Sequence, residues 1–467
     1  MKTSSAWEKY TKKEIKELDQ LSRSYRKFLD HGKTERECVR EIIQQAEREG
    51  YENLNEAVKK GKKPKSGDKF YAVNMEKAVI LFQVGKKPLE EGLNILGAHI
   101  DSPRLDIKQN PLYEDGNFAL LDTHYYGGIK KYQWVTIPLA MHGVIVKKDG
   151  TKVHVSIGED EEDPVFFVSD LLVHLSAEQL EKKASKVIEG EALDIIIGNR
   201  PLADKKADKN EEKKEKDPVA AYAMKLLQDA YDIEEKDFLS AELEVVPAGK
   251  AREAGIDRSM VIGYGQDDRV CAFSSLEAML AVEEVDRTAC CILVDKEEIG
   301  SVGATGMQSR FFENSVAELM ALTGQYSELL LRRALANSRM LSSDVSSAFD
   351  PTYASSFDKK NVAYLGHGMV FNKFTGSRGK SGSNDANAEY LGFIRKVMED
   401  AGVSYQTAEL GKVDLGGGGT IAYILSLYGM NVIDCGVPVL NMHAPNEVTS
   451  KADLYEAKKG YMAFLLA

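Results

Sequence analysis

The sequence predicts an α/β protein: a mixed, largely parallel sheet flanked by helices, with a second, β-rich domain inserted into it. After residue 255, apolar strand-like runs alternate with helical patterns, which is typical of a parallel sheet. Between residues 105 and 248, apolar and polar residues alternate as in half-buried strands. Polar residues suited to a site follow several of the apolar runs, and open α/β sheets gather their sites at strand ends.

These changes of pattern divide the chain at two places. Residues 1–104 are expected to form the first part of the α/β domain, 105–249 the inserted β-rich domain, and 250–467 the second part of the α/β domain. The first part is predicted to contain amphipathic helices at 6–30 and 35–49, a loop at 59–69, and the strands YAVN and AVILFQVG. The insert is predicted to contain strands in WVTIPLAMHGVIVKK and VHVSIG. Its charge run at 203–217 is too polar to pack, which predicts a mobile excursion.

The last part of the chain continues the alternation. Leu391, Ile394 and Met398 recur at helical spacing, with Asn384 or Asp385 as the expected N-cap and Gly402 as the stop. The segments that follow continue the strand and helix pattern: VSYQTAEL, TIAYILSLY and NVIDCGVPVL. A largely parallel sheet is therefore expected here.

Five potential metal ligands lie at or just after apolar runs, far apart in the sequence: His99, Asp268, Glu298, Asp344 and His443. Divalent zinc-like ions bind imidazole nitrogen and carboxylate oxygen, and two ions about 3.5–4 Å apart can share one carboxylate and a water. Two histidines and three carboxylates, one of them bridging, would give each ion three protein contacts. The pattern therefore predicts a two-metal hydrolase.

Two neighbouring carboxylates complete this hypothesis. In an extended chain, the side chains of His99 and Asp101 lie on one face, so Asp101 could hold the imidazole nitrogen that does not bind metal. Glu297 precedes Glu298 after the apolar run CCILV, and both can face one site only where the backbone leaves the extended conformation. One of the two would bind metal, and the other would take a proton from the water.

Each feature also has an ordinary interpretation. His99 and Asp101 alone could be a simple hydrogen-bonded pair, and the adjacent aspartates 267 and 268 could lie in a solvated loop or a helix cap. Paired glutamates are often surface charge. The joint placement of all these residues after strands favours the metal site.

The ordered motifs resemble a known family. G-A-H-I-D-S-P, D-D-R, D-K-E-E-I-G-S, S-S-D and M-H-A-P-N-E resemble the aspartyl aminopeptidases, di-zinc exopeptidases whose pattern is G-x-H-x-D-S-P, L-D-N, x-x-E-E-V-G-S, S-x-D and M-H-S-x-R-E. The resemblance extends from about residue 95 to the C-terminus. It implies four zinc ligands and three further roles: ligands His99, Glu298, Asp344 and His443, bridge Asp268, general base Glu297, and supporting carboxylate Asp101.

The same resemblance implies two Zn²⁺ ions per subunit, with Co²⁺ or Mn²⁺ as possible substitutes, and peptide substrates. It also implies a homo-oligomer, a dodecamer, in which the inserted domain serves as lid and assembly domain. The activity expected is removal of one N-terminal residue from a peptide through a bridging water. A di-metal deacylase or carboxypeptidase on the same site, or a metal-stabilised scaffold without catalysis, are the alternatives. A scaffold would not need a carboxylate such as Glu297 beside the metals.

This chain departs from the family pattern after S-S-D, where Val345-Ser346-Ser347 stands in place of M-A-H, and in three further places. Where the family has L-D-N, this chain has two aspartates, so Asp268 is assigned by register and Asp267 is the rival bridge. Where the family has a histidine that enters a neighbouring subunit, this chain places Asp170, with His174 four residues later.

The last of these departures concerns the substrate pocket. No lysine is in clear register for binding an acidic substrate side chain, although three basic residues lie close by: Lys373, Arg378 and Lys380. An N-terminal Asp or Glu is the substrate residue expected if one of them enters the pocket. The glycine run at 416–419 lacks the Lys-Ser/Thr of a phosphate loop, so it is either backbone approaching the site or a flexible loop.

Composition excludes other classes of function. The net charge of −12 argues against a nucleic-acid partner, because there is no basic face to displace counterions from phosphates. No run of about 18 apolar residues occurs, and the N-terminus has no apolar core of signal-peptide length. We therefore expect no membrane association and a cytoplasmic location.

Overall fold

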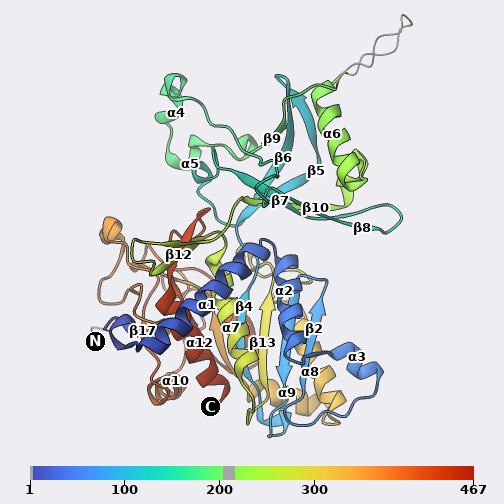
Figure 1. Ribbon diagram of the computed structural model, residues 1–467. Coiled ribbons are helices and arrows are strands. Elements are labelled where there is room, and N and C mark those ends of the chain that lie inside the picture. The colour runs from blue at the N-terminus through green and yellow to red at the C-terminus, as the bar shows by residue number, and fades with distance from the viewer. Residues whose placement is uncertain (1–3, 203–215) are drawn as a thin grey trace, which may run out of the picture. The chain divides into compact units, whose positions relative to one another are not determined.

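The computed structural model describes residues 4–202 and 216–467, which fold into two compact units (Figure 1). The first unit contains Met1–Ser102, Ala251–Met442 and Asn446–Ala467, and the second contains Pro103–Lys250 and His443–Pro445. The first unit is built on a mixed sheet with helices, and the second is β-rich. The predicted α/β class with a β-rich insert is confirmed.

The first unit is organised by a nine-stranded sheet, counted over the described residues, in the order β1-β2-β3-β13-β4-β14-β18-β16-β17. Its strands are β1 Glu52–Asn53, β2 Lys69–Asn74, β3 Ala78–Gln83, β4 Asn94–His99, β13 Ala289–Val294, β14 Arg339–Ser343, β16 Met369–Asn372, β17 Tyr405–Thr407 and β18 Asn431–Gly436. The four central strands β13, β4, β14 and β18 are parallel. Their carboxyl ends therefore lie at one edge of the sheet, where the residues that follow them can meet.

Helices cover both faces of this sheet (Figure 1). One apolar core contains residues of α1 Lys12–His31, α2 Glu35–Arg48, α7 Gln266–Ala281, α10 Ala388–Asp400 and α12 Lys451–Leu465. The other contains residues of α3 Leu54–Lys59, α8 Phe311–Leu322, α9 Glu328–Ala336 and α11 Ala422–Ser426. Because strand side chains alternate between faces, the central strands are buried on both sides; β13 is wholly apolar, whereas β4, β14 and β18 also carry polar residues.

Side-chain caps set several helix ends. Thr11 and Thr34 begin α1 and α2 with capping boxes, in which a glutamate three residues on bonds back to the cap. The helix predicted over 6–30 is therefore broken before Thr11, and a separate 3-10 helix spans Ala6–Lys9. The cap of α10 is Asn387, whose side chain accepts from the Tyr390 N–H at 2.8 Å, and not Asn384 or Asp385. Asn384, Asp385 and Asn387 lie so close together that sequence spacing alone did not identify which of them caps the helix.

A smaller sheet in the first unit has the order β11-β12-β20-β19-β15. Its strands are β11 Arg252–Ala254, β12 Met260–Gly263, β15 Ser346–Ser347, β19 Pro438–Leu440 and β20 Glu447–Ser450. Gly263, the last residue of β12, pairs with Glu447, the first residue of β20. This pairing brings Glu447 beside the chain segment that enters α7.

The second unit is a six-stranded antiparallel sheet, counted over the described residues, in the order β8-β7-β10-β5-β6-β9. Its strands are β5 Arg104–Asp115, β6 Phe118–Tyr126, β7 Leu139–Val146, β8 Lys152–Ile157, β9 Ile195–Gly198 and β10 Ala241–Pro247. Helix α6, Pro218–Tyr231, packs Val219, Ala220 and Ala223 against Ala119 of β6. The strands predicted in WVTIPLAMHGVIVKK and VHVSIG correspond to β7 and β8.

Two further observations concern the chain as a whole. Among the described residues, no helix combines the length and the apolar character needed to cross a membrane. The charge run at 203–217, predicted to be a mobile excursion, falls outside the described residues except for its last two positions.

Candidate metal centre

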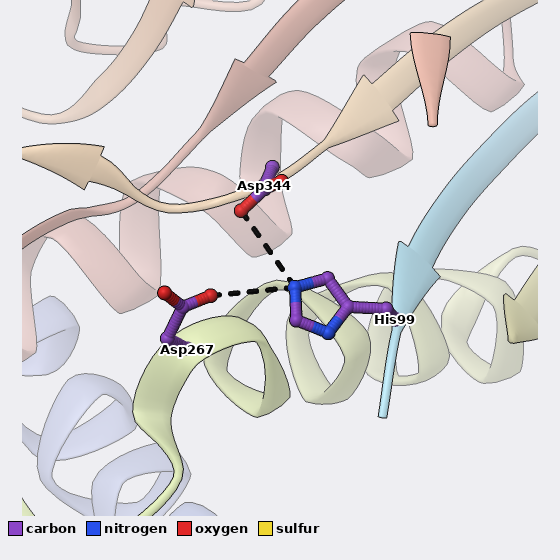
Figure 2. A group of neighbouring side chains, drawn as sticks. All are labelled: His99, Asp267 and Asp344. Atoms are coloured by element: carbon purple, nitrogen blue, oxygen red, sulfur yellow. Dashed lines mark ion pairs between the residues drawn. The ribbon is translucent and has the colours of Figure 1, made fainter. Parts of the chain in front are cut away.

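His99 is the centre of the site and is the last residue of β4. Its side chain is 1% exposed, and Nε2 lies 3.3 Å from Asp267 Oδ1 and 3.8 Å from Asp344 Oδ1 (Figure 2). The same nitrogen lies 3.8 Å from Glu297 Oε2. Asp344 directly follows β14, the parallel neighbour of β4. Ligand atoms of His99, Asp267 and Asp344 all lie within 4.8 Å of one another, which is close enough to share one ion.

Asp101 fixes the other nitrogen of the imidazole. His99 Nδ1 lies 3.1 Å from the Asp101 carbonyl oxygen and 3.3 Å from its Oδ1. Both oxygens can only accept, so Nδ1 carries a proton and Nε2 is the nitrogen left to bind a metal. Burial lowers the pKa of His99, but the neighbouring carboxylates of Asp101, Asp267 and Asp344 raise it well above its ordinary value. Nε2 is buried without a hydrogen-bond partner among the described residues, as suits an atom that binds metal.

The two glutamates reach the site through a break in the extended backbone. After β13 ends at Val294, Lys296 adopts a left-handed conformation with φ 69°, and Glu297–Ile299 forms a short 3-10 helix. The carboxylate of Asp101 accepts the N–H of Glu297 at 3.1 Å and of Glu298 at 3.2 Å. The sequence required such a turn if both side chains were to face one site.

Charge accumulates at this edge of the sheet. Burial, and then the neighbouring carboxylate of Asp344, raise the pKa of Glu297 to about 8. Carboxylate oxygens of Asp267 and Glu298 also lie within 4.8 Å of each other. A concentration of buried acidic groups with imidazole nitrogen fits divalent zinc, which neutralises carboxylates and binds both kinds of atom.

Asp267, rather than Asp268, lies beside His99. At the start of α7 the backbone is non-helical at Asp267 (φ −80°, ψ 108°) and Asp268 (φ −112°, ψ 28°), and the two side chains take different directions. Asp268 is fully buried and belongs to no candidate ligand group in the described residues. Burial, and then the charge of Asp344, raise the pKa of Asp268 well above its ordinary value. Asp267, the rival position, thus belongs to both candidate ligand groups of the described residues, whereas Asp268, whose two carboxylate oxygens are buried without a hydrogen-bond partner there, belongs to neither.

Glu447 and Ser102 hold the backbone of Asp267 from both sides. Glu447 Oε2 accepts the Asp267 N–H at 2.9 Å, and Ser102 Oγ donates to the Asp267 carbonyl at 2.7 Å. Ser102 lies in the motif H-I-D-S-P and Glu447 in M-H-A-P-N-E, but the sequence did not predict that either residue contacts Asp267. Their membership of these two motifs is the signal by which the sequence could have indicated a role for them.

His443 belongs to the second unit by its contacts. Its Nδ1 lies 2.8 Å from the carbonyl oxygen of Gly128. Because that oxygen can only accept, Nδ1 donates and Nε2 is the nitrogen suited to a metal. A Cβ at position 128 would lie 3.4 Å from Nδ1, so glycine permits this close approach.

The remaining candidates lie on loops. Lys380 Nζ pairs with Asp385 at 3.2 Å and lies 3.9 Å from the ring centre of Phe374. The glycine run packs closely on this basic loop, since a Cβ at Gly417 would lie 1.8 Å from the Gly376 carbonyl oxygen. The two loops line one small pocket, which includes Arg378 and Lys380. The run is thus backbone in close approach to another loop.

Asp170 and His174 are exposed in the second unit. Asp170 Oδ1 accepts from Gln179 Nε2 at 2.9 Å, and His174 lies in a short 3-10 helix, Val173–Leu175. Neither has a ligand geometry among the described residues.

The chain is similar to proteins described as aminopeptidases over nearly its full length. A probable M18 family aminopeptidase 1 of Clostridium acetobutylicum is 63% identical over 461 residues, covering 99% of this chain and 97% of the relative. A Thermotoga maritima relative of the same description is 43% identical over 470 residues, covering 100% and 99%.

Solved structures agree. Aminopeptidase I from Clostridium acetobutylicum matches with a TM-score of 0.92 and 61% identity, covering 99% of this chain and 98% of that one. An M18 aminopeptidase from Thermotoga maritima matches with a TM-score of 0.93 and 43% identity, covering 100% of this chain and 99% of that one. The profile of the aminopeptidase I zinc metalloproteases (M18) matches residues 28–465, a range that includes every ligand candidate described above. The chain therefore belongs to the M18 family of zinc metallo-aminopeptidases.

Proposed function

We propose that this zinc aminopeptidase holds two metal ions per chain and uses them to remove one N-terminal residue from peptides. His99 and Asp344 would bind one ion, Glu298 the other, and Asp267 would bridge them. His443 joins the second ion on the strength of the family resemblance. The observation that carries the proposal is the geometry of His99, whose Nδ1 is held by Asp101 while Nε2 faces Asp267 and Asp344.

Membership of an aminopeptidase family sets aside the deacylase, carboxypeptidase and scaffold alternatives. Two zinc ions bound here would lower the pKa of a shared water and polarise the scissile carbonyl. Other divalent ions such as Co²⁺ or Mn²⁺ have the same kinds of ligand available.

Glu297 is the residue we assign as general base. Its carboxylate is 3.8 Å from His99 Nε2, so it lies beside the ligands without being needed in the first ion's ligand set. It would take the proton of the attacking water and deliver it to the leaving amine. Its N–H bond to Asp101 couples its position to that of His99. Asp101 therefore acts as a positioning residue for both the ligand and the base.

The substrate preference we propose is for an acidic N-terminal residue. The small pocket between the basic loop and the glycine run includes Arg378 and Lys380, and a charge-assisted bond would favour a carboxylate. We also propose a cytoplasmic location.

We further propose that the chain forms a homo-oligomer of twelve copies, with residues 105–249 as lid and assembly domain. One solved structure of similar fold, at 19% identity, is described as a dodecamer of yeast aminopeptidase 1. The second unit carries an apolar stretch with unusually exposed side chains: Leu171, Leu172, Val173, Leu175 and Leu180. Such a stretch favours contact with another chain.

The metal proposal predicts two zinc ions per chain. Asp267→Ala should reduce bound zinc to one ion per chain or fewer, because the shared ligand is lost. Asp268→Asn should retain both ions, since that carboxylate lies outside the ligand group. Elemental analysis after gentle dialysis measures the ratio, and circular dichroism checks the fold. Equal zinc in both variants, or loss only in the Asp268 variant, would refute the assignment of the bridge.

Glu297→Gln should keep zinc and fold but lower kcat by roughly 10²–10⁴-fold, because glutamine cannot accept the proton. Glu318→Gln, a change at an exposed position on α8, is the matched control and should leave kcat unchanged. Turnover of the Glu297 variant near that of the control would mean that another group is the base.

The preference for acidic residues predicts a higher kcat/KM for Asp- and Glu-arylamides than for Leu- or Lys-arylamides. Arg378→Gln or Lys380→Gln should raise KM for the acidic substrates and leave that for Leu-arylamide unchanged, because only the acidic substrate loses an ion pair. Lys359→Gln, at another exposed position, is the control. A Leu-arylamide value above both acidic values would reject the preference.

Light scattering should give a mass near twelve times that of the 51.7 kDa chain. Leu172→Asp with Leu175→Asp should lower the mass, because buried contacts would acquire charge. Leu329→Asp, exposed on α9 in the first unit, should not. A monomer at micromolar concentration for the unmodified chain would contradict the assembly.

A further inference from the structure

A polar row crosses the central sheet. Ser342 on β14 pairs with Gly97 on β4 and with Asp434 on β18, and Asp434 pairs in turn with Asn372 on β16. Residues paired across neighbouring strands project to the same face, with Cβ atoms about 4.5–5.5 Å apart. The side chains of Ser342, Asp434 and Asn372 therefore stand next to one another on one face.

This row lies between the apolar core and the metal ligands. Two residues before it on the same strands, Met340 and Val432 belong to the core that contains α8 and α11. Two residues after it come His99, at the end of β4, and Asp344, just after β14. Because strand side chains alternate with a period of two, the row is the layer directly below the metal centre.

Three oxygen atoms in the row lack a hydrogen-bond partner among the described residues. They are Ser342 Oγ, Asp434 Oδ2 and Asn372 Oδ1, and the three side chains are 0%, 1% and 6% exposed. The other carboxylate oxygen of Asp434 accepts from Thr420 Oγ1 at 2.5 Å, and Asn372 Nδ2 donates to Ser346 Oγ at 3.5 Å. Buried oxygens rarely stay unsatisfied, so a group bound between them is expected.

The row is also closed and carries an uncompensated charge. A Cβ at Gly97 would meet Met340 Cε at 2.3 Å and Ile421 Cδ1 at 3.4 Å, so apolar side chains already fill that end. No ion pair joins Asp434 to a basic side chain in the described residues. Burial, opposed by the Thr420 bond, and the charge of Asp344 raise the pKa of Asp434 to about 7. A buried carboxylate of this kind costs stability unless a positive charge balances it.

We propose that Ser342, Asp434 and Asn372 bind one monovalent alkali cation, Na⁺ or K⁺, directly below the zinc ligands. Hard cations of this kind bind oxygen atoms, and one carboxylate with two neutral oxygens balances one positive charge. A proton on Asp434 would neutralise the carboxylate and could join it to one neighbouring oxygen, but it would leave the third oxygen without a partner. A water would serve the oxygens but leave the charge. The cation does both. The set lacks nitrogen and sulfur, which separates it from the zinc centre.

Bound there, the cation would act on two parts of the enzyme. Its charge would offset that of Asp434 beneath Asp344, which is a zinc ligand in the proposed function. It would also keep Asp434 ionised and bonded to Thr420, which directly follows the glycine run. Ser342, Asp434 and Asn372 lie outside the proposed zinc ligand set, so cation binding to them can be followed by thermal unfolding without measuring turnover.

The test measures thermal unfolding of the zinc-loaded protein in choline chloride replaced stepwise by KCl or NaCl at constant ionic strength. We expect a saturable rise in Tm of about 2 °C with at least one of the two cations, because ligand binding to the folded state stabilises it. Asp434→Asn should abolish the response. Asp237→Asn, a buried aspartate in the second unit, is the matched control and should retain it.

Two further measurements keep the proposal testable if Asp434→Asn does not fold. Ser342→Ala should raise the half-saturating cation concentration by roughly tenfold, because one oxygen contact to a charge is lost. Crystals of the unmodified protein soaked in Tl⁺ should give an anomalous peak between Asp434 and Asn372. Equal Tm in all three salts, or Tl⁺-soaked crystals without that peak, would overturn the proposal.

Discussion

The carboxylate of Asp101 is the interaction on which the metal centre depends. It lies 3.3 Å from His99 Nδ1 and accepts the N–H groups of Glu297 and Glu298, so one buried side chain joins the end of β4 to the turn after β13. A carboxylate can accept several bonds at once, and charge-assisted bonds are about twice as strong as neutral ones. The orientation of the imidazole and the positions of Glu297 and Glu298, the proposed base and a proposed ligand, are therefore set together. Displacing Asp101 would disturb all three.

The site concentrates negative charge in a place from which water is largely excluded. Asp101, Asp267 and Asp268 are each less than 4% exposed, and Glu297 has a raised pKa because of burial and of Asp344. Carboxylates held this close repel one another and lose hydration, so their stable coexistence requires protons or cations. The two zinc ions of the proposed function would meet this requirement at His99, Asp267 and Asp344, and the proposed alkali cation would meet it one layer below. The buried carboxylates therefore need a neutralising positive charge at the place where the proposed zinc ions would act.

Glycines let the backbone approach this region closely. A Cβ at Gly436 would lie 1.8 Å from the carbonyl oxygen of Asp344, whose N–H in turn bonds to the Cys435 carbonyl at 2.8 Å. Strand β18 can therefore run directly beside Asp344, a proposed ligand. The glycine run makes the same kind of approach to the basic loop, at Gly417. These contacts explain why glycine occurs at positions 417 and 436, where a side chain would clash with the neighbouring backbone.

The sequence by itself determined the α/β class, the β-rich insert, and the position of His99 with Asp101 two residues later, because periodicity of two and residue chemistry are local properties. It also required the turn that brings Glu297 and Glu298 together. Tertiary structure alone gave Asp267 and Asp268 different surroundings, on which the proposed bridge rests, since adjacent residues share the same sequence context and differ only in the direction that the backbone gives them. It also placed Glu447 and Ser102 on the backbone of Asp267, and Asn372 beside Asp434. Such contacts join segments up to 180 residues apart, and no local pattern encodes which strands become neighbours.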